Sequence, residues 1–339
     1  RQMCIRDSTY IHYNNNKCEV LVMIFRGRQL FRLKVGLVLA GGGAKGAYQA
    51  GVIRALWDLD LIDNIDVVSG VSIGTLNALC LCMKNRDLID QSWKSLSYSK
   101  IVTQGDGLKI SDIGDLIKKI TIHKGEPIVD SIDLGALGLI SQKGIRDYIK
   151  EFVDVGILHK TNIDVYSCAY NVTDGHPEYF RLNDYSEEEI IDITLGSCAV
   201  PYIFPPVSFK GKQYADGGIN NPLYASANAD NVPISPLMNH DLDLIIVVHL
   251  TYTDQVDKRL YQQFNIIEIY PSSSLELING SGTLNFNQAS ITEKIQTGYR
   301  DALVSLTPML IANLKGKSMS PYIRHHMKWN DQFLKKYRK

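Results

Sequence analysis

Residues 35–46 have the sequence Val35-Gly36-Leu37-Val38-Leu39-Ala40-Gly41-Gly42-Gly43-Ala44-Lys45-Gly46, a short apolar run followed by a triple glycine and the start of a helical pattern. Glycines let the backbone turn sharply and bring its N–H groups close to an anion, and a helix N-terminus adds about half a positive charge. A tight strand-to-helix turn explains the same residues without a ligand. Residues 41–46 are therefore either an anion-binding loop or a plain turn, and other motifs have to decide.

Two nucleotide-binding motifs fit this segment poorly. Residues 41–46 match G-x-G-x-x-G, but the dinucleotide fingerprint also requires an acidic residue at the C-terminal end of the next strand. That strand ends Val68-Ser69-Gly70-Val71-Ser72, and its only acid, Asp66, lies at the other end. A phosphate loop ending in G-K-[ST] fails as well, because Gly46 follows Lys45. The pattern argues against a module that binds NAD or ATP.

Further along the chain, short apolar runs alternate with amphipathic helical patterns. This alternation is typical of βαβ units and predicts an α/β fold with a mainly parallel sheet covered on both faces. The predicted strands are Val35–Leu39, Asp66–Ser69, Asp164–Tyr170, Glu178–Arg181, Leu244–Leu250 and Ile266–Tyr270. The predicted helices are Ala44–Asp58, Ile73–Lys84, Ile110–Ile120, Gly144–Phe152, Glu187–Cys198 and Gln288–Leu303, the fifth beginning with the capping-box pair Ser186 and Glu189.

No internal repeat and no Pro/Gly/Ser-rich linker divides the body, so we expect a single domain over residues 35–305. Segment 97–143 is rich in Gly and Ile/Leu without a clear strand, which predicts an inserted cap. The run Arg1-Gln2-Met3-Cys4-Ile5-Arg6-Asp7-Ser8 resembles a translated sequencing adapter, so residues 1–22 are expected to be disordered or adventitious, with Met23 as a candidate start.

Charge is unevenly distributed although the net charge is zero, with 36 basic and 36 acidic residues. Residues 1–34 hold 7 basic and 2 acidic side chains, and residues 307–339 hold 8 basic and 1 acidic. The body between them therefore holds 21 basic and 33 acidic side chains. An acidic body is a poor partner for phosphates, so we expect no nucleic-acid binding. The basic tail, residues 306–339, is either a solvated terminal helix or a contact for anionic lipid headgroups.

Six cysteines occur without a C-x-x-C pair or a regular spacing, which argues against a zinc site and a disulfide framework. Reduced thiols predict a cytoplasmic protein. The sequence shows neither a secretory leader nor an apolar run of about 20 residues that could span a membrane. We therefore expect a cytoplasmic protein, with peripheral membrane contact if the basic tail binds lipid.

A serine stands between two glycines in Gly70-Val71-Ser72-Ile73-Gly74, where a predicted strand gives way to a predicted helix. Small flanking residues allow the strained elbow that lifts a serine hydroxyl into a cleft above the sheet. An N-cap serine is the alternative interpretation. The position between strand and helix favours Ser72 as a nucleophile.

A second candidate lies far downstream in Asp216-Gly217-Gly218. An Asp beside two glycines is usually a turn residue. A serine hydroxyl, however, needs a neighbour within about 2.6–3.2 Å to accept its proton, and a positioned carboxylate can do this directly. Together with the other two motifs, Asp216 becomes the candidate base.

The triple glycine after the first strand, Gly-x-Ser-x-Gly after the second and the distant Asp-Gly-Gly together resemble the patatin-like phospholipase family of lipid acyl hydrolases. The stretches Ser197 to Val207 and Gly298 to Ala302 resemble that family too, so the likeness covers about residues 35–305. It implies a three-layer α/β/α fold and a Ser–Asp dyad of Ser72 and Asp216 without histidine. It also implies an oxyanion hole at Gly41, Gly42 and Gly43, with Lys45, Gly46, Gly70, Gly74, Gly217 and Gly218 supporting the motifs. Many members have Arg where this chain has Lys45, which weakens any bidentate role there.

The implied reaction is hydrolysis of (phospho)lipid acyl esters through an acyl-enzyme on Ser72, which needs no cofactor and no metal. No D-x-[DN]-x-[DN]-G calcium loop occurs. We expect an apolar channel for the acyl chain, with Ile132, Leu134, Leu137, Leu139 and Ile140 as candidate lining residues and ordinary core packing as their alternative. Lipid class, acyl position and oligomeric state are left open by the sequence.

Three alternatives use other chemistry. An acyltransferase would use the same nucleophile and pass the acyl group to an alcohol or a thiol. A Ser–His–Asp hydrolase would recruit His249 or His240, although His249 lies in a predicted buried strand, where a core histidine is the simpler interpretation. A nucleotide-binding module would show no esterase activity. A carboxylate base predicts activity below pH 6 unless burial raises its pKa.

Overall fold

The computed structural model describes residues 33–101, 103–104, 140–201, 203–218, 230–276 and 282–337. Residues 1–22, the helix expected at Ile110–Ile120, most of segment 97–143 and the channel candidates between Ile132 and Leu139 lie outside this part of the chain.

The centre of the molecule is a mixed, mainly parallel sheet in the order β10-β9-β1-β2-β5-β8-β7, with β6 paired to β5 off this path. Strands β1 (Val35–Leu39), β2 (Ile65–Val71), β5 (Asp164–Asn171), β9 (Leu244–Val248) and β10 (Ile266–Ile269) run parallel to one another. Strands β6 (His176–Arg181) and β8 (Lys212–Asp216) are antiparallel to β5, and β7 (Val207–Phe209) is antiparallel to β8. Every residue of β1, β9 and β10 is buried, as expected for strands covered on both faces.

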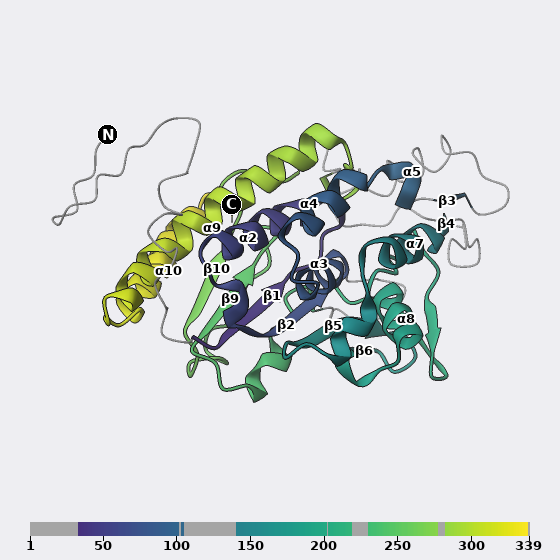
Figure 1. The fold of residues 1–339 in the computed structure, drawn as a ribbon, viewed down its shortest axis with the longest axis horizontal. Coiled ribbons are helices and arrows are strands. Elements are labelled where there is room, and N and C mark those ends of the chain that lie inside the picture. The colour runs from purple at the N-terminus through teal and green to yellow at the C-terminus, as the bar shows by residue number, and fades with distance from the viewer. Residues whose placement is uncertain are drawn as a thin grey trace.

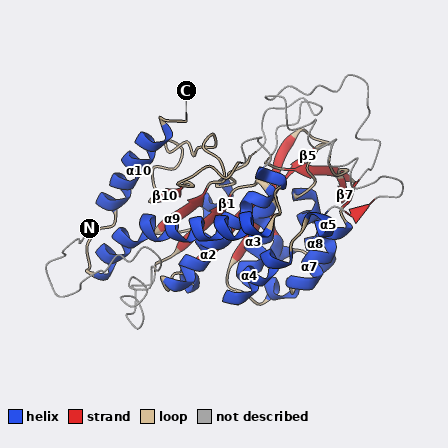
Figure 2. Ribbon diagram, turned by 90° about the horizontal axis from the view of Figure 1, so that it is seen from above, coloured by secondary structure: helices blue, strands red, loops and turns tan. Residues whose placement is uncertain are grey.

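Helices flank this sheet, giving an α/β/α arrangement of layers (Figures 1 and 2). Figure 2 shows α2 (Ala47–Asp58), α3 (Ile73–Cys82) and α4 (Arg86–Ser95) together on one side of the strands. Helix α2 packs closely along α9 (Gln288–Leu314), because glycines at both crossing points leave no side chain between them. A Cβ added at Gly298 would overlap Tyr48 O, and one at Gly51 would overlap Ile295 O. The remaining elements are α5 (Tyr98–Ile101), α7 (Lys143–Phe152), α8 (Glu187–Ser197), α10 (Ser320–Leu334) and the two-stranded β3 (Thr103–Gln104) and β4 (Ile140–Ser141).

The predicted α/β fold is confirmed, and all six predicted strands occur within a few residues of their expected bounds. Helix α8 begins with the predicted capping box, in which Glu189 accepts hydrogen bonds from the backbone N–H and the hydroxyl of Ser186. Strands β3, β4, β7 and β8 and helices α4 and α5 were not predicted from the pattern. Helix α10 lies in the basic tail, for which a terminal helix was one of the two interpretations.

The C-terminal part of the chain is helical. Helix α9 runs to Leu314 through Pro308, so the boundary expected at residue 305 falls inside it. Helix α10 begins at Ser320-Pro321 and buries Ile323, Asn330 and Leu334. Within the described ranges, no helix has both the length and the apolar character needed to cross a bilayer.

Candidate active site

Ser72 occupies a strained elbow between the end of β2 and the start of α3. Its φ is 55° and its ψ is −126°, a left-handed conformation that costs a non-glycine residue about 1–3 kcal/mol. The backbone N–H of Ser72 donates to Ser197 Oγ over 2.8 Å, which helps to hold this conformation. Gly74 allows the elbow to sit tightly on β1, because a Cβ there would overlap Leu39 O. Ser72 is only 7% exposed and lines an apolar pocket.

Strand β5 brings Asp216 to the same level of the sheet as Ser72. Val71 pairs with Cys168 on one side of β5, and Asp216 pairs with the next residue, Ala169, on the other side. Two further hydrogen bonds fix Asp216: its N–H donates to Ala199 O over 2.9 Å, and its Oδ1 accepts from Gly218 N–H over 2.9 Å. The structure therefore brings the two predicted site residues together, although 144 positions separate them.

The Asp216 carboxyl is 2% exposed, and this burial raises its pKa to about 6. The Ser72 hydroxyl and the Gly218 N–H both favour the charged form and limit the rise. Ser72 thus lies close enough to the Asp216 carboxylate to affect its pKa. No hydrogen bond of ordinary length and angle joins the two side chains. Catalytic hydrogen bonds are often long or poorly aligned before substrate binds. Asp216 Oδ2 has no hydrogen-bond partner within the described residues, so this oxygen is free to accept a proton.

A group of buried hydroxyls supports the elbow from below, and no sequence motif singled it out. Ser197 Oγ donates to Cys168 O over 2.6 Å and also lies 3.3 Å from Thr75 Oγ1. Thr75 Oγ1 lies 3.1 Å from Ser167 Oγ. The group therefore ties α3, α8 and β5 together directly beneath Ser72. Ser197 belongs to the stretch that resembles the patatin-like family, which was the one available signal.

The glycine loop differs from one N–H group to the next in whether a described residue accepts its hydrogen bond. Gly41 N–H donates to Asn231 Oδ1 over 3.0 Å, so this amide is not available to a substrate in the structure. The N–H groups of Gly42 and Gly43 have no acceptor within the part of the chain that the structure describes. Gly43 has a φ of 55° and lines the same pocket as Ser72. Gly42 and Gly43 remain the predicted oxyanion donors.

Lys45 and the other motif residues position the loops of the site. Lys45 Nζ pairs with Glu276 Oε1 over 2.7 Å, and Glu276 Oε2 accepts from Gly282 N–H over 3.0 Å. Gly46 O accepts from Asn77 Nδ2 over 3.0 Å. Close packing explains three of the glycines, since a Cβ on Gly46, Gly70 or Gly217 would press against Ile73, Gly74 or Cys168 respectively.

An apolar pocket of about 90 Å³ opens at Ser72. Its walls come from α3, α5, α7, the turn after α8 and the segment before α9, and the lining residues are Gly43, Ser72, Ile73, Leu76, Leu96, Ile101, Ile145, Tyr148, Cys198, Val200, Ile203, Phe204, Thr283 and Phe286. Neither the side chain of Ile140 nor the other channel candidates fall in the described part of the chain. Five of the wall residues belong to helices predicted from the sequence, namely Ile73, Leu76, Ile145, Tyr148 and Cys198. Ile101 lies in segment 97–143, which was predicted to form a cap.

The two candidate histidines have other partners. His249 is fully buried, lies 3.1 Å from Glu268 Oε1 through Nε2 and stacks on Tyr270. His240 lies 3.3 Å from the Tyr166 hydroxyl and 3.8 Å from Asp164, the first residue of β5, whereas Ser72 follows the carboxyl end of the neighbouring β2. Among the described residues, no histidine forms a hydrogen bond with Ser72 or Asp216. The structure therefore does not favour a Ser–His–Asp triad.

A serine elbow on a mainly parallel sheet, next to a buried carboxylate and an apolar pocket, is the arrangement of an α/β serine acyl hydrolase. The family model for patatin-like phospholipases matches residues 37–237, more than half of the chain. The chain belongs to the patatin-like phospholipase family, which confirms the resemblance found in the sequence.

Known relatives with similar sequences are much longer proteins. The lysophospholipase nte1 of Aspergillus terreus is 23% identical over 227 residues, which cover 67% of this chain and 12% of that protein. The lysophospholipase NTE1 of Cryptococcus neoformans var. neoformans is 26% identical over 248 residues, which cover 69% of this chain and 12% of that protein. The match to the neuropathy target esterase sws of Drosophila persimilis is 39% over 70 residues, or 21% of this chain and 5% of that protein.

Two solved structures match this chain at low sequence identity. VipD from Legionella pneumophila has a TM-score of 0.47 at 17% identity, covering 84% of this chain and 67% of VipD. The human GIVD cytosolic phospholipase A2, solved with a fluorophosphonate inhibitor and terbium chloride, has a TM-score of 0.42 at 13% identity. The match covers 87% of this chain and 60% of the phospholipase chain.

Proposed function

We propose that this chain hydrolyses acyl esters of lipids, with Ser72 as the nucleophile and Asp216 as the base. The observation that supports this most directly is the strained serine beside a buried carboxylate at the mouth of an apolar pocket. The family supplies the substrate class, a lipid ester. The lysophospholipase names of the relatives suggest a lysophospholipid as the first substrate to test.

In the proposed mechanism, Ser72 Oγ attacks the ester carbonyl carbon while Asp216 Oδ2 takes the serine proton. The N–H groups of Gly42 and Gly43 stabilise the negative charge on the carbonyl oxygen, and one such donor contributes about 10²–10³-fold in rate. Asp216 then gives its proton to the leaving alcohol, which departs as the Ser72 ester forms. Water attacks that ester with Asp216 again accepting a proton, and this proton passes to Ser72 Oγ as its bond to the acyl group breaks and the fatty acid is released.

The protonation state of Asp216 sets the pH range. The carboxyl has to be deprotonated to act as a base, and burial raises its pKa to about 6, so activity is expected to rise with pH and to level off above about 7. A neutral histidine with its ordinary pKa near 6.5 would give a similar profile. A pH profile by itself therefore does not separate the two bases, and substitution of the histidines is needed.

The apolar pocket is suited to the acyl chain rather than to the headgroup. Its walls are aliphatic and aromatic apart from the hydroxyls of Ser72, Thr283 and Tyr148 and the thiol of Cys198. Each buried methylene contributes about 0.8 kcal/mol, so chain length is expected to control kcat/KM strongly.

We also propose that the enzyme acts at a membrane surface in the cytoplasm, with α10 as the contact. Trp329 and Tyr337 are each 47% exposed, and α10 and its C-terminal turn carry the exposed cations Arg324, Lys328, Lys335 and Lys336. Interfacial aromatics and basic side chains together favour anionic headgroups. The four cysteines described are free and buried, in keeping with a reducing compartment.

Vesicle binding followed by Trp329 fluorescence tests this contact. We expect a blue shift with vesicles of phosphatidylcholine and phosphatidylserine that 0.5 M NaCl or the double variant K328E/K335E abolishes. An equal shift with pure phosphatidylcholine at high salt would contradict the charge-based contact.

The enzymatic proposal is tested with a panel of acyl esters of different chain length and headgroup. We expect turnover by the wild type and by His240→Ala and His249→Ala, and none above background by Ser72→Ala and Asp216→Asn. A fluorophosphonate should label the wild type only at Ser72. Loss of turnover in a folded histidine variant would replace the dyad by a triad, and acyl transfer to an added alcohol in preference to water would identify a transferase.

A further inference from the structure

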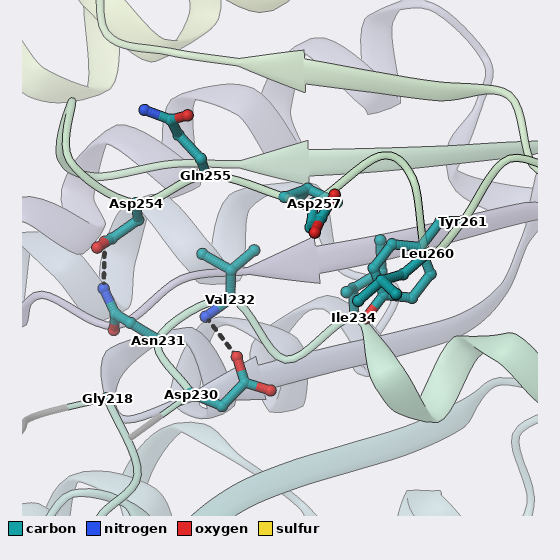
Figure 3. A pocket seen from close by; sticks show the side chains of 11 residues that line it. Gly218, Asp230, Asn231, Val232, Ile234, Asp254, Gln255, Asp257, Leu260 and Tyr261 are labelled. Carbon is teal, nitrogen blue, oxygen red and sulfur yellow. Dashed lines mark hydrogen bonds between the residues drawn. The ribbon is translucent and has the colours of Figure 1, made fainter. Parts of the chain in front are cut away.

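Asn231 links the glycine loop to the loop after β9. Its Oδ1 accepts the Gly41 N–H over 3.0 Å, and its Nδ2 donates to Asp254 Oδ2 over 2.6 Å (Figure 3). Nδ2 also lies 3.5 Å from Gly41 O. One amide side chain therefore contacts both the N–H and the C=O of Gly41, although 190 positions separate the two residues.

The same amide oxygen also packs against the turn that follows the candidate base. A Cβ added at Gly41 would lie 2.6 Å from Asn231 Oδ1, and one added at Gly218 would overlap it. Gly218 in turn donates its N–H to Asp216 Oδ1. Asn231 Oδ1 thus fits between the glycine loop and the Asp216 turn, and its position sets how close the two come.

Asp254 determines which end of the amide faces Gly41. An ionised carboxylate only accepts hydrogen bonds, so the Asn231 Nδ2 has to face Asp254 and Oδ1 has to face the Gly41 N–H. Asp254 is held in turn by Thr251, whose hydroxyl donates to Asp254 Oδ2 over 2.8 Å, and by Tyr270, whose hydroxyl donates to Asp254 O over 3.2 Å. Asn231 and Asp254 border a cavity of about 310 Å³ (Figure 3).

We propose that Asn231 is a positioning residue that fixes the glycine loop, with Asp254 orienting its amide. This inference rests on the proposed function, because the loop matters as the oxyanion site of that reaction. Asn231 engages Gly41 and thereby holds the loop in which the N–H groups of Gly42 and Gly43 have no acceptor among the described residues. A displacement of about 1 Å in such a site can cost about 10²-fold in rate.

A swap of the two side chains is the sharpest test. Asn231→Asp alone places two carboxylates face to face, and Asp254→Asn alone removes the group that orients the amide. The double variant N231D/D254N restores one acceptor toward Gly41 and one donor between the two residues, and the Thr251 hydroxyl can adapt because it both donates and accepts. We expect each single variant to lose about 10- to 100-fold in kcat with KM changed less than about threefold. The double variant should recover to within about fivefold of the wild type.

Asn183 offers a matched control at the other end of β5. It also braces the backbone with its amide, accepting from Val165 N–H over 2.8 Å and donating to Leu158 O and Ile163 O. Asn183→Asp should lower the melting temperature and leave kcat within about twofold, which separates a positioning effect from general destabilisation.

Amide hydrogen exchange across residues 40–46 gives a readout independent of activity. Exchange should be faster in both single variants than in the wild type and should slow again in the double variant. Single variants with wild-type kcat and wild-type exchange would overturn the inference, and a folded double variant no better than the worse single variant would overturn the role of Asp254. If the wild type and Ser72→Ala turn over esters equally, the proposed function fails, whereas the exchange pattern still decides whether Asn231 holds the loop.

Discussion

Replacing Asp216 by Asn should abolish activity and at the same time stabilise the protein at neutral pH. The buried carboxyl has a pKa of about 6 in the folded chain against an ordinary value of 3.8, because burial disfavours its charged form. This difference corresponds to about 3 kcal/mol, at 1.36 kcal/mol per pKa unit. Asparagine has nearly the same shape and no charge, so it avoids this cost.

The sign of the pH dependence follows from proton linkage. Between about pH 4 and pH 6 the folded state holds a proton on Asp216 that the unfolded state has lost, so raising the pH through this window favours unfolding. Below the window both states are protonated and the penalty disappears. Above about pH 6 the full penalty applies, and the gain from Asp216→Asn should reach its maximum there.

Urea unfolding at pH 4 and at pH 8 measures this gain. We expect Asp216→Asn to exceed the wild type in unfolding free energy by about 3 kcal/mol at pH 8 and by much less at pH 4. Asp174→Asn is a control for which the change in unfolding free energy should have the opposite sign. Hydrogen bonding to Lys212 lowers the pKa of the exposed Asp174 carboxyl, so removing this carboxylate should lower the unfolding free energy slightly at pH 8. An Asp216→Asn variant that is less stable than the wild type at pH 8 would refute the reasoning.

Three more perturbations test the pocket and the packing. Ile145→Phe narrows the apolar pocket. Excluding about four methylenes at about 0.8 kcal/mol each should lower kcat/KM for long-chain esters about 200-fold and leave short esters unaffected. An equal loss for both would contradict an acyl pocket. Gly298→Ala forces α9 away from Tyr48 O on α2 and should destabilise the protein by about 2 kcal/mol or more in urea unfolding, whereas a change below about 0.5 kcal/mol would show that the helices separate easily. Ser186→Ala removes the hydroxyl of the α8 capping box and should lower the free energy of unfolding by about 1 kcal/mol without changing kcat. A loss of activity would show that α8 affects the site.

The parts of the fold predicted from sequence are those in which a local pattern and the tertiary environment agree. Strand β1 has its predicted bounds because the run Val35–Leu39, which is apolar except for Gly36, suits a strand covered on both faces. Strand β8 was missed because Lys212 and Gln213 make it polar at one end and only its last three residues are buried. A helix in the tail was expected only as a solvated one, because the basic residues concealed the three residues that α10 buries, Ile323, Asn330 and Leu334.

The candidate site divides in the same way. Ser72 and Asp216 stand in motifs whose glycines are required by local geometry, so the sequence itself pointed to them. Asn231 stands in no motif, and its partner Gly41 lies 190 positions earlier, so only the folded chain brings the two together. The availability of the Gly41 N–H was likewise invisible in the sequence, because it depends on that distant amide.

Burial explains how a carboxylate can serve as the base in the proposed mechanism without a histidine. A general base works best when its pKa lies near the operating pH, and an ordinary Asp at 3.8 is too weak a base for a serine hydroxyl. Enclosing Asp216 brings its pKa to about 6, close to the ordinary value of histidine, at a cost of about 3 kcal/mol in folding free energy. The Gly218 N–H and the Ser72 hydroxyl stop the rise there, so the carboxyl remains charged at neutral pH. The stability that Asp216→Asn should recover and the base strength that it should remove therefore have one physical origin.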